Sequence, residues 1–255
     1  MGRSNARWFV LHAALVAALL AGAGCAVNPQ AHRNEPGGTP APAGSLPCLG
    51  GLRAYRFSGE LKFNAGQGQT RNQIGSLANL LQDVRFDGAH RAPLSTQLHV
   101  TFPQGSSQAV ETIRIGGTQY QRVGNGAWET ANSSAGPFVA ALSSLDPETL
   151  CQQTLATVST AGKTPTSETV DGVATQHYTF PPGELAHTPG LFGQRREGGN
   201  AQQASTTLDV WTAADNRYPL RIAVQSSDAA DGTSFQLTLD VRDPNGADIA
   251  IRAPR

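Results

Sequence analysis

The sequence has little charge and almost no lysine. Only 15% of its 255 residues are charged, 19 Lys and Arg balance 19 Asp and Glu, and lysine occurs only at Lys62 and Lys163. A nucleic-acid-binding surface needs clustered lysine and arginine to neutralise phosphates, so this composition excludes nucleic acid as an expected partner. A surface this poor in charge must be covered by Ser, Thr, Gln, Asn and Gly, which suits an exported protein.

Motifs for catalysis and metal binding are also lacking. The sequence contains no G-x-S-x-G, no H-E-x-x-H and no phosphate-binding loop. Its six histidines are scattered without metal-ligand spacing or a partner nucleophile. Acidic clusters such as Asp243 and Asp248 fall in turn-like segments, where turn chemistry explains them without a cation. We therefore expect no enzyme, no metal site and no cofactor.

Residues 1–24 have the features of an export signal. Arg3 and Arg7 form a basic start, an apolar stretch runs to Leu20, and small residues follow it up to Cys25. The stretch is too short to span a bilayer comfortably, so it predicts a cleaved segment. A cysteine directly after small residues resembles the lipobox of bacterial lipoproteins, which implies that Cys25 is acylated and becomes the mature N-terminus. The alternative is a plain signal peptide with an incidental cysteine.

The two other cysteines, Cys48 and Cys151, are then an even pair. In an oxidising compartment a disulfide between them is the default expectation, and it would close a loop of about 100 residues. Two buried thiols are the alternative, because the sequence fixes neither their distance nor their orientation.

Glycine and proline dominate residues 25–52, which contain hardly any large apolar side chain. This composition predicts a tether between a lipidated Cys25 and a folded domain at residues 53–255. The chain as a whole would then be an extracytoplasmic protein, anchored to a bacterial cell membrane by its N-terminal acyl chains.

From residue 53 onward, apolar and polar side chains alternate, as in half-buried β-strands. The pattern is clear from Tyr55 to Phe63, and in the C-terminal third it recurs in several segments that end with Ile249 and Ile251. Short turn signals such as Asp171-Gly172 separate these segments, so neighbouring strands must be antiparallel.

Helical spacing is confined to a few segments. Residues 75–84 and 137–145 have apolar side chains on one helical face, and Asp146-Pro147 has the form of an N-cap and first helical residue for a segment through Val158. The predicted fold is mainly β (α+β): a curved antiparallel half-barrel of about 9–11 strands, covered by two or three short helices. Helices this short leave part of the apolar face uncovered.

Several segments occur in an order that resembles a known family. They are Asp87-Gly88-Ala89 with Pro93, Ile113–Gly116 with Tyr120 and Trp128, Asp209–Trp211 through Tyr218–Ile222, and Asp243–Asn245. Together with the lipobox, this order resembles the LppX/LprAFG-type bacterial lipoproteins, whose fold is similar to the LolA and LolB carriers and the RseB sensor. The resemblance implies a half-open barrel around a cavity that holds acyl chains of lipids or lipoprotein anchors, without catalytic residues.

The expected cavity lining consists of apolar side chains from the predicted helices and strands. The lining residues are Leu77, Leu80, Leu81, Phe138, Leu142, Leu145, Phe57, Leu61, Phe63, Leu98 and Val100. Residues 189–205 have neither strand nor helix period and are either a flap, gated by Leu191 and Phe192, or disordered. The alternative for each lining residue is a closed core in which these side chains pack only against one another.

The sequence therefore predicts a lipid-anchored protein that binds an acyl lipid or a lipoprotein anchor and carries or presents it at the cell envelope. The alternative function is a lipid-anchored protein-interaction or envelope-sensor module that transfers no lipid. A possible protein partner in the envelope belongs to either hypothesis.

Overall fold

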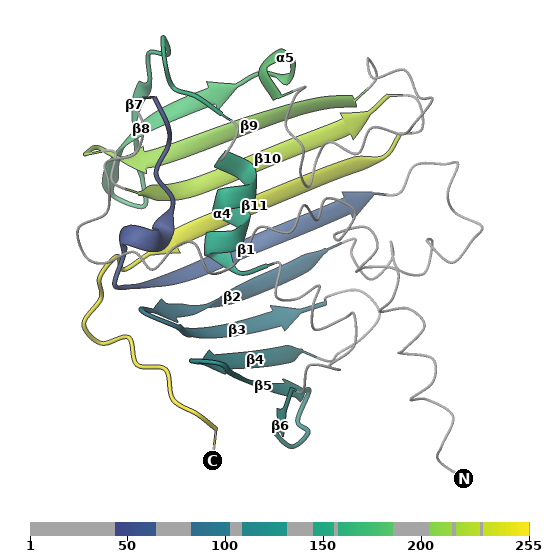
Figure 1. Ribbon diagram of the computed structural model, residues 1–255. Coiled ribbons are helices and arrows are strands. Elements are labelled where there is room, and N and C mark those ends of the chain that lie inside the picture. The colour runs from purple at the N-terminus through teal and green to yellow at the C-terminus, as the bar shows by residue number, and fades with distance from the viewer. Residues whose placement is uncertain are drawn as a thin grey trace.

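The computed structural model describes residues 44–64, 83–102, 109–131, 145–155, 158–185, 204–215, 218–229 and 232–254. In these ranges, eleven strands form one sheet (Figure 1) in the order β6-β5-β4-β3-β2-β1-β11-β10-β9-β8-β7. Every neighbouring pair is antiparallel. The prediction of a mainly β fold with about 9–11 antiparallel strands is confirmed.

The strand order makes two meanders that meet in the middle of the sheet. The strands are β1 (Ala54–Asn64), β2 (Val84–Arg91), β3 (Ser95–Thr101), β4 (Val110–Ile115), β5 (Thr118–Val123), β6 (Glu129–Thr130), β7 (Thr166–Val170), β8 (Val173–Phe180), β9 (Ala204–Ala213), β10 (Pro219–Asp228) and β11 (Ser234–Arg242). Strand β1 pairs with β2 on one side and with β11 on the other, so the first and last strands of the domain are neighbours.

Tight turns connect the strands where the sequence predicts them. Asp171 and Gly172 both have positive φ, 49° and 82°, as a type I′ turn requires between β7 and β8. Gly116, with φ 60°, lies in the turn between β4 and β5. These local signals fix the hairpins independently of the rest of the sheet.

One face of the sheet is apolar. Across nine neighbouring strands, from β8 to β5, the residues directly opposite one another form an unbroken line, which we call the apolar row. The apolar row consists of Tyr178, Val210, Ile222, Leu239, Gly59, Phe86, Val100, Val110 and Val123. Among the large hydrophobic side chains of the apolar row, only Val123, at the β5 end, is exposed.

The other face carries charge. Its polar row runs across ten strands through residues that are also directly opposite one another. The polar row consists of Arg122, Glu111, His99, Asp87, Ser58, Asp240, Arg221, Trp211, His177 and Thr166. Neighbours in it form ion pairs, for example Arg122 Nη2 to Glu111 Oε1 at 2.6 Å. The sheet therefore needs its main cover on the apolar face.

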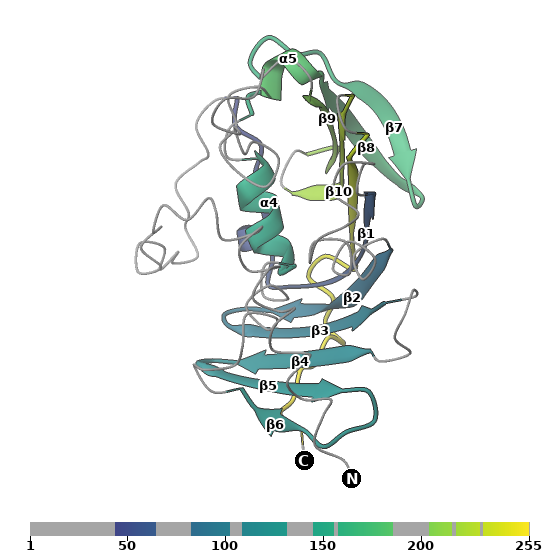
Figure 2. The same ribbon diagram turned by 90° about the vertical axis from the view of Figure 1, so that its right-hand side faces the viewer.

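Short elements pack on the apolar face. They are η1 (Leu49–Gly51) and α4 (Pro147–Leu155), with α5 (Pro182–Leu185) near one end of the sheet. Leu150 and Leu155 of α4 belong to the same buried cluster as the apolar side chains of the strands, and Figure 2 shows α4 alongside the sheet. As the sequence predicts, Asp146 caps this helix: its Oδ1 accepts from the Thr149 backbone N–H at 3.2 Å.

Several expected elements differ from the structure. Val84, expected in a helix, is the first residue of β2, and Leu145, expected at the end of another, lies in a turn before α4. Helix α4 ends at Leu155, before Val158. For Val84, helical spacing to the leucines before it suggested a helix, but its pairing with Leu61 of β1 makes it a strand residue.

The C-terminal residues also differ from expectation. Ile249 and Ile251 alternate like a strand, but residues 247–254 form no strand. Asn245 diverts the chain, because its backbone N–H donates to the Ala54 carbonyl at 2.6 Å and its Oδ1 accepts from the Arg53 N–H at 2.8 Å. Ile249 then packs against Ala54 and Ala89 on the polar face of the sheet.

Candidate functional site

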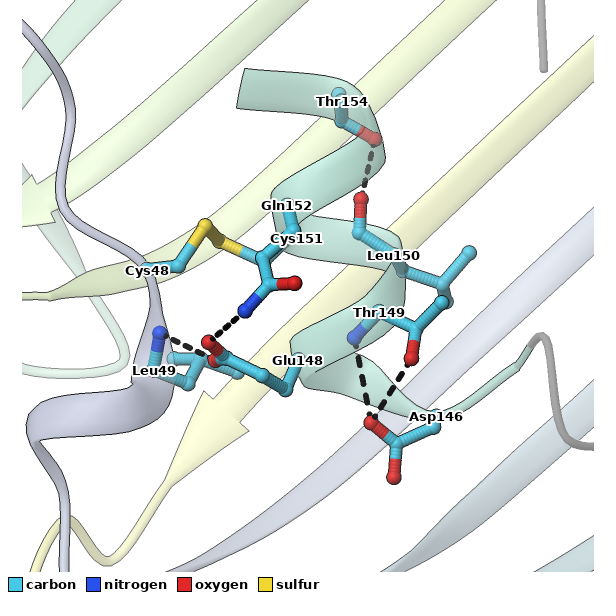
Figure 3. Close-up of a disulfide and its surroundings, with 9 residues drawn as sticks. All are labelled: Cys48, Leu49, Asp146, Glu148, Thr149, Leu150, Cys151, Gln152 and Thr154. Carbon is cyan, nitrogen blue, oxygen red and sulfur yellow. Dashed lines mark hydrogen bonds between the residues drawn. A yellow bond between two sulfur atoms is a disulfide. The ribbon is translucent and has the colours of Figure 1, made fainter. Parts of the chain in front are cut away.

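Helix α4 is tied to the segment that precedes β1 (Figure 3). The structure joins Cys48 to Cys151 by a disulfide, with the two Cα atoms 5.7 Å apart. Next to it, Glu148 Oε2 accepts from the Leu49 backbone N–H at 2.8 Å. Burial raises the pKa of the Glu148 carboxyl, and the bonds from Gln152 and Leu49 partly oppose this effect.

Residues 44–52 consequently belong to the folded body and not to a free tether. Leu49 is 1% exposed, and Leu46 and Leu52 are also buried in the main cluster. The Gly44 carbonyl accepts from the Thr160 backbone N–H at 2.7 Å, so the association begins at the first described residue. The high glycine and proline content of this stretch suggested a tether, although its three leucines all reach the core.

The apolar face is much wider than α4. Nine strands at about 4.8 Å spacing place the ends of the apolar row about 38 Å apart, whereas a helix with its side chains is about 10–12 Å wide. Helix α4 has 9 residues, which makes it about 14 Å long. This helix alone therefore covers only a part of the apolar row.

At one end of the central strands, the apolar face is only half-buried. Leu61 and Phe63 of β1 and Phe235 of β11 have intermediate exposure, and we call these three residues the apolar rim. Phe63 lies directly opposite Phe235. One pair further into the sheet, Leu237 is 3% exposed and lies opposite Leu61. The rim is thus the continuation of the buried core toward the surface.

Two hydroxyl groups extend the rim across the next strands. Ser226 of β10 lies opposite Phe235, and Thr206 of β9 lies opposite Ser226. The two hydroxyl oxygens are 2.9 Å apart and hydrogen-bonded. Across the four strands β1, β11, β10 and β9, the residues at this end of the apolar face therefore change from aromatic to hydroxyl-bearing side chains.

The opposite end of the same face is closed by polar contacts. The His90 ring stacks on the Tyr55 ring with centroids 5.0 Å apart, and His90 Nδ1 lies 3.2 Å from Thr96 Oγ1. Arg114 Nη2 pairs with Asp146 Oδ2 at 3.1 Å, which connects β4 to the start of α4. Burial lowers the pKa of His90, so the neutral imidazole is favoured there.

Sequence reasoning assigned His90 no more than a structural or surface role and did not find this cluster. The strand alternation carries the signal: His90 has the same parity as Phe86 in β2, and therefore lies on the apolar face. A histidine at an apolar position of a strand is a candidate for a buried ring contact.

The predicted lining residues divide into three groups. Phe57, Leu98 and Val100 are fully buried, at 3%, 4% and 0% exposure, while Leu61 and Phe63 lie in the rim. Leu145 is buried in the same cluster, at the N-terminal side of α4. Cys25, Leu77, Leu80, Leu81, Phe138, Leu142, Leu191 and Phe192 lie outside the residues that the structure describes.

A second cluster that sequence reasoning missed lies on the polar face. The His177 ring stacks on Trp211 with centroids 4.2 Å apart, Nδ1 lies 2.8 Å from Glu168 Oε1, and Nε2 lies 2.9 Å from Asp209 Oδ1. Hydrogen bonds from Trp211 and His177 lower the pKa of Glu168. The cluster fastens the edge strand β7 to β8 and β9.

Neither cluster forms a metal site: within the described ranges, no group of three or more His, Cys, Asp or Glu side chains is arranged to hold a metal ion. In the same ranges, no helix is both long and apolar enough to cross a membrane. The Cys48–Cys151 disulfide indicates an oxidising, extracytoplasmic compartment.

The described part of the chain is therefore a mainly β domain: one open antiparallel sheet with a buried apolar face and a charged outer face. No family model matches the sequence, and no curated protein matches it. One similar solved structure is a Vibrio parahaemolyticus domain described as an outer membrane lipoprotein-sorting protein domain. It shares 12% identity over 77% of this chain and 87% of that chain, with a TM-score of 0.27. At this TM-score, the likeness adds nothing to the strand order and contacts described above.

Proposed function

We propose that this protein is a lipid-anchored, extracytoplasmic binding protein that holds an acyl chain against the apolar face of its sheet and carries or presents it at the cell envelope. The apolar row is the observation that supports this proposal most directly. It runs unbroken across nine strands, and the half-buried rim continues the same face toward the surface.

The hydrophobic effect supplies the binding energy in this proposal. Each methylene that leaves water for an apolar surface gains about 0.8 kcal/mol, so an acyl chain that lies along part of the apolar row gains several kcal/mol. No catalytic step is required, because binding and release alone account for carriage or presentation. The segment order that resembles the LppX/LprAFG-type lipoproteins is consistent with the same role.

Anchoring belongs to the proposal as well. Cys25 follows a basic start and an apolar stretch, and acylation at this residue would hold the protein at a membrane. A Cys25→Ser variant is expected to move from the membrane fraction to the soluble fraction. Unchanged membrane association would refute lipidation at Cys25 and leave lipid binding to be judged separately.

Mass spectrometry of protein purified from its native host tests the binding function. A bound acyl lipid is expected at about one molecule per chain, and a fluorescent long-chain fatty acid is expected to bind the delipidated protein. An interior that neither retains lipid nor takes up the fatty acid would refute lipid binding and favour the protein-interaction module.

A matched pair of variants on β1 localises the binding. Phe63→Ser places a hydroxyl on the apolar face, whereas Lys62→Ser changes the next residue, which faces the polar side. We expect Phe63→Ser to weaken fatty-acid binding at least fivefold and Lys62→Ser to leave it within twofold. Equal affinities for the two variants would show that the ligand does not contact this face.

A further inference from the structure

The cover formed by α4 is fixed at both of its sides. The Cys48–Cys151 disulfide and the bond from Leu49 N–H to Glu148 hold it to the segment before β1. The ion pair between Arg114 and Asp146 holds its first turn to β4. Leu150 and Leu155 are each 3% exposed, so displacement of α4 would uncover buried side chains as well as strain these ties.

The two ends of β1 differ in how firmly they are closed. At its start, Tyr55 is 1% exposed and stacks on His90. At its other end, Leu61 and Phe63 are only half-buried. Eight residues of extended strand separate Tyr55 from Phe63, a distance of about 27 Å. Cys48 lies in the segment that leads into the start of β1, so the disulfide is attached on the Tyr55 side of this strand and the rim lies at its other end.

From this asymmetry we infer that the acyl chain enters and leaves over the apolar rim of Leu61, Phe63 and Phe235, while α4 remains in place as a fixed cover. The inference rests on the proposed lipid-binding function and adds the route that the ligand takes. The rim side chains are only half-buried, whereas access past α4 requires its fully buried leucines and its ion pair to separate. The hydroxyls of Thr206 and Ser226, beside the rim, are placed to contact a polar head group.

Rates of binding test this route separately from affinity. Leu61→Trp narrows the rim but leaves it apolar, so stopped-flow measurements with a fluorescent long-chain fatty acid should show association and dissociation each slowed at least tenfold. The dissociation constant should change by less than either rate, because a narrower passage slows association and dissociation together. Lys62→Trp, on the polar face of the same strand, is the control and should leave both rates within twofold.

A second variant and a reductant complete the experiment. Folding of each variant is checked by circular dichroism. If Leu61→Trp fails to fold, Phe63→Trp replaces it in the experiment and should likewise slow both association and dissociation. Reduction of the disulfide in wild-type protein that remains folded should leave both rates within twofold, because access does not require α4 to move. Unchanged rates in both rim variants, or rates raised tenfold by reduction, would overturn the inference. Wild-type protein that binds no fatty acid would instead refute the proposed function.

Discussion

Removal of the disulfide provides a quantitative test of how much the covalent tie contributes to the fold. Cys48 and Cys151 are 103 residues apart in the sequence, and closure of a loop of this length restricts the unfolded chain by about 4.7 kcal/mol in the chain-entropy model. Typical domains are stable by only about 5–15 kcal/mol. The double variant Cys48→Ala/Cys151→Ala should therefore lose a third or more of the free energy of unfolding.

Urea denaturation followed by circular dichroism measures this loss. We expect the free energy of unfolding to fall by about 3–5 kcal/mol, and the midpoint of thermal unfolding by about 6–20 °C for a domain of this size. Wild-type protein in reductant should fall to the same value, whereas the double variant should not respond to reductant. A loss below about 1 kcal/mol would contradict the reasoning, since the loop of 103 residues would then contribute almost nothing to stability.

Two further predictions concern β1 and β2. A Cβ atom at Gly59 would overlap the ring of Phe86, so Gly59→Ala should lower the free energy of unfolding, measured by urea titration, by about 1–3 kcal/mol. A Cβ atom at Gly117 meets no other atom, so the control variant Gly117→Ala should change this free energy by less than about 0.5 kcal/mol. Burial lowers the pKa of His90 in the folded protein, so as the pH falls the unfolded chain takes up the proton first, and the free energy of unfolding decreases below about pH 6.5. His90→Phe should therefore lose less of this free energy than wild type between pH 8 and pH 5. Parallel losses in the two proteins would show that His90 does not contribute to the pH dependence.

Local patterns in the sequence predicted the strands and hairpins well. Alternation from Tyr55 to Phe63 corresponds to β1, and the Asp171-Gly172 turn joins β7 to β8 as expected. Asp146 and Pro147 begin α4 at the predicted residues. Each of these features depends on residues close together in the chain, whose side-chain period and backbone preferences are legible without knowledge of distant contacts.

The candidate site could be predicted only in part. Strand parity correctly assigned Phe57 and Val100 to the buried face, but it could not distinguish them from Leu61 and Phe63 in the rim. The difference in exposure depends on which other segments cover each end of β1. The alternation of residues along β1 carries no information about those segments. For the same reason, His90 could not be recognised as a buried ring partner of Tyr55.

The sequence by itself determined which segments are strands, where they turn, and which side chains of each strand share a face, because all of this follows from local backbone and hydrophobic preferences. Only the tertiary structure decided that β1 pairs with β11, that residues 44–52 join the core, and that the apolar and polar rows each continue across the sheet. These features depend on contacts between residues far apart in the chain, whose free energy is gained only when the whole sheet is assembled.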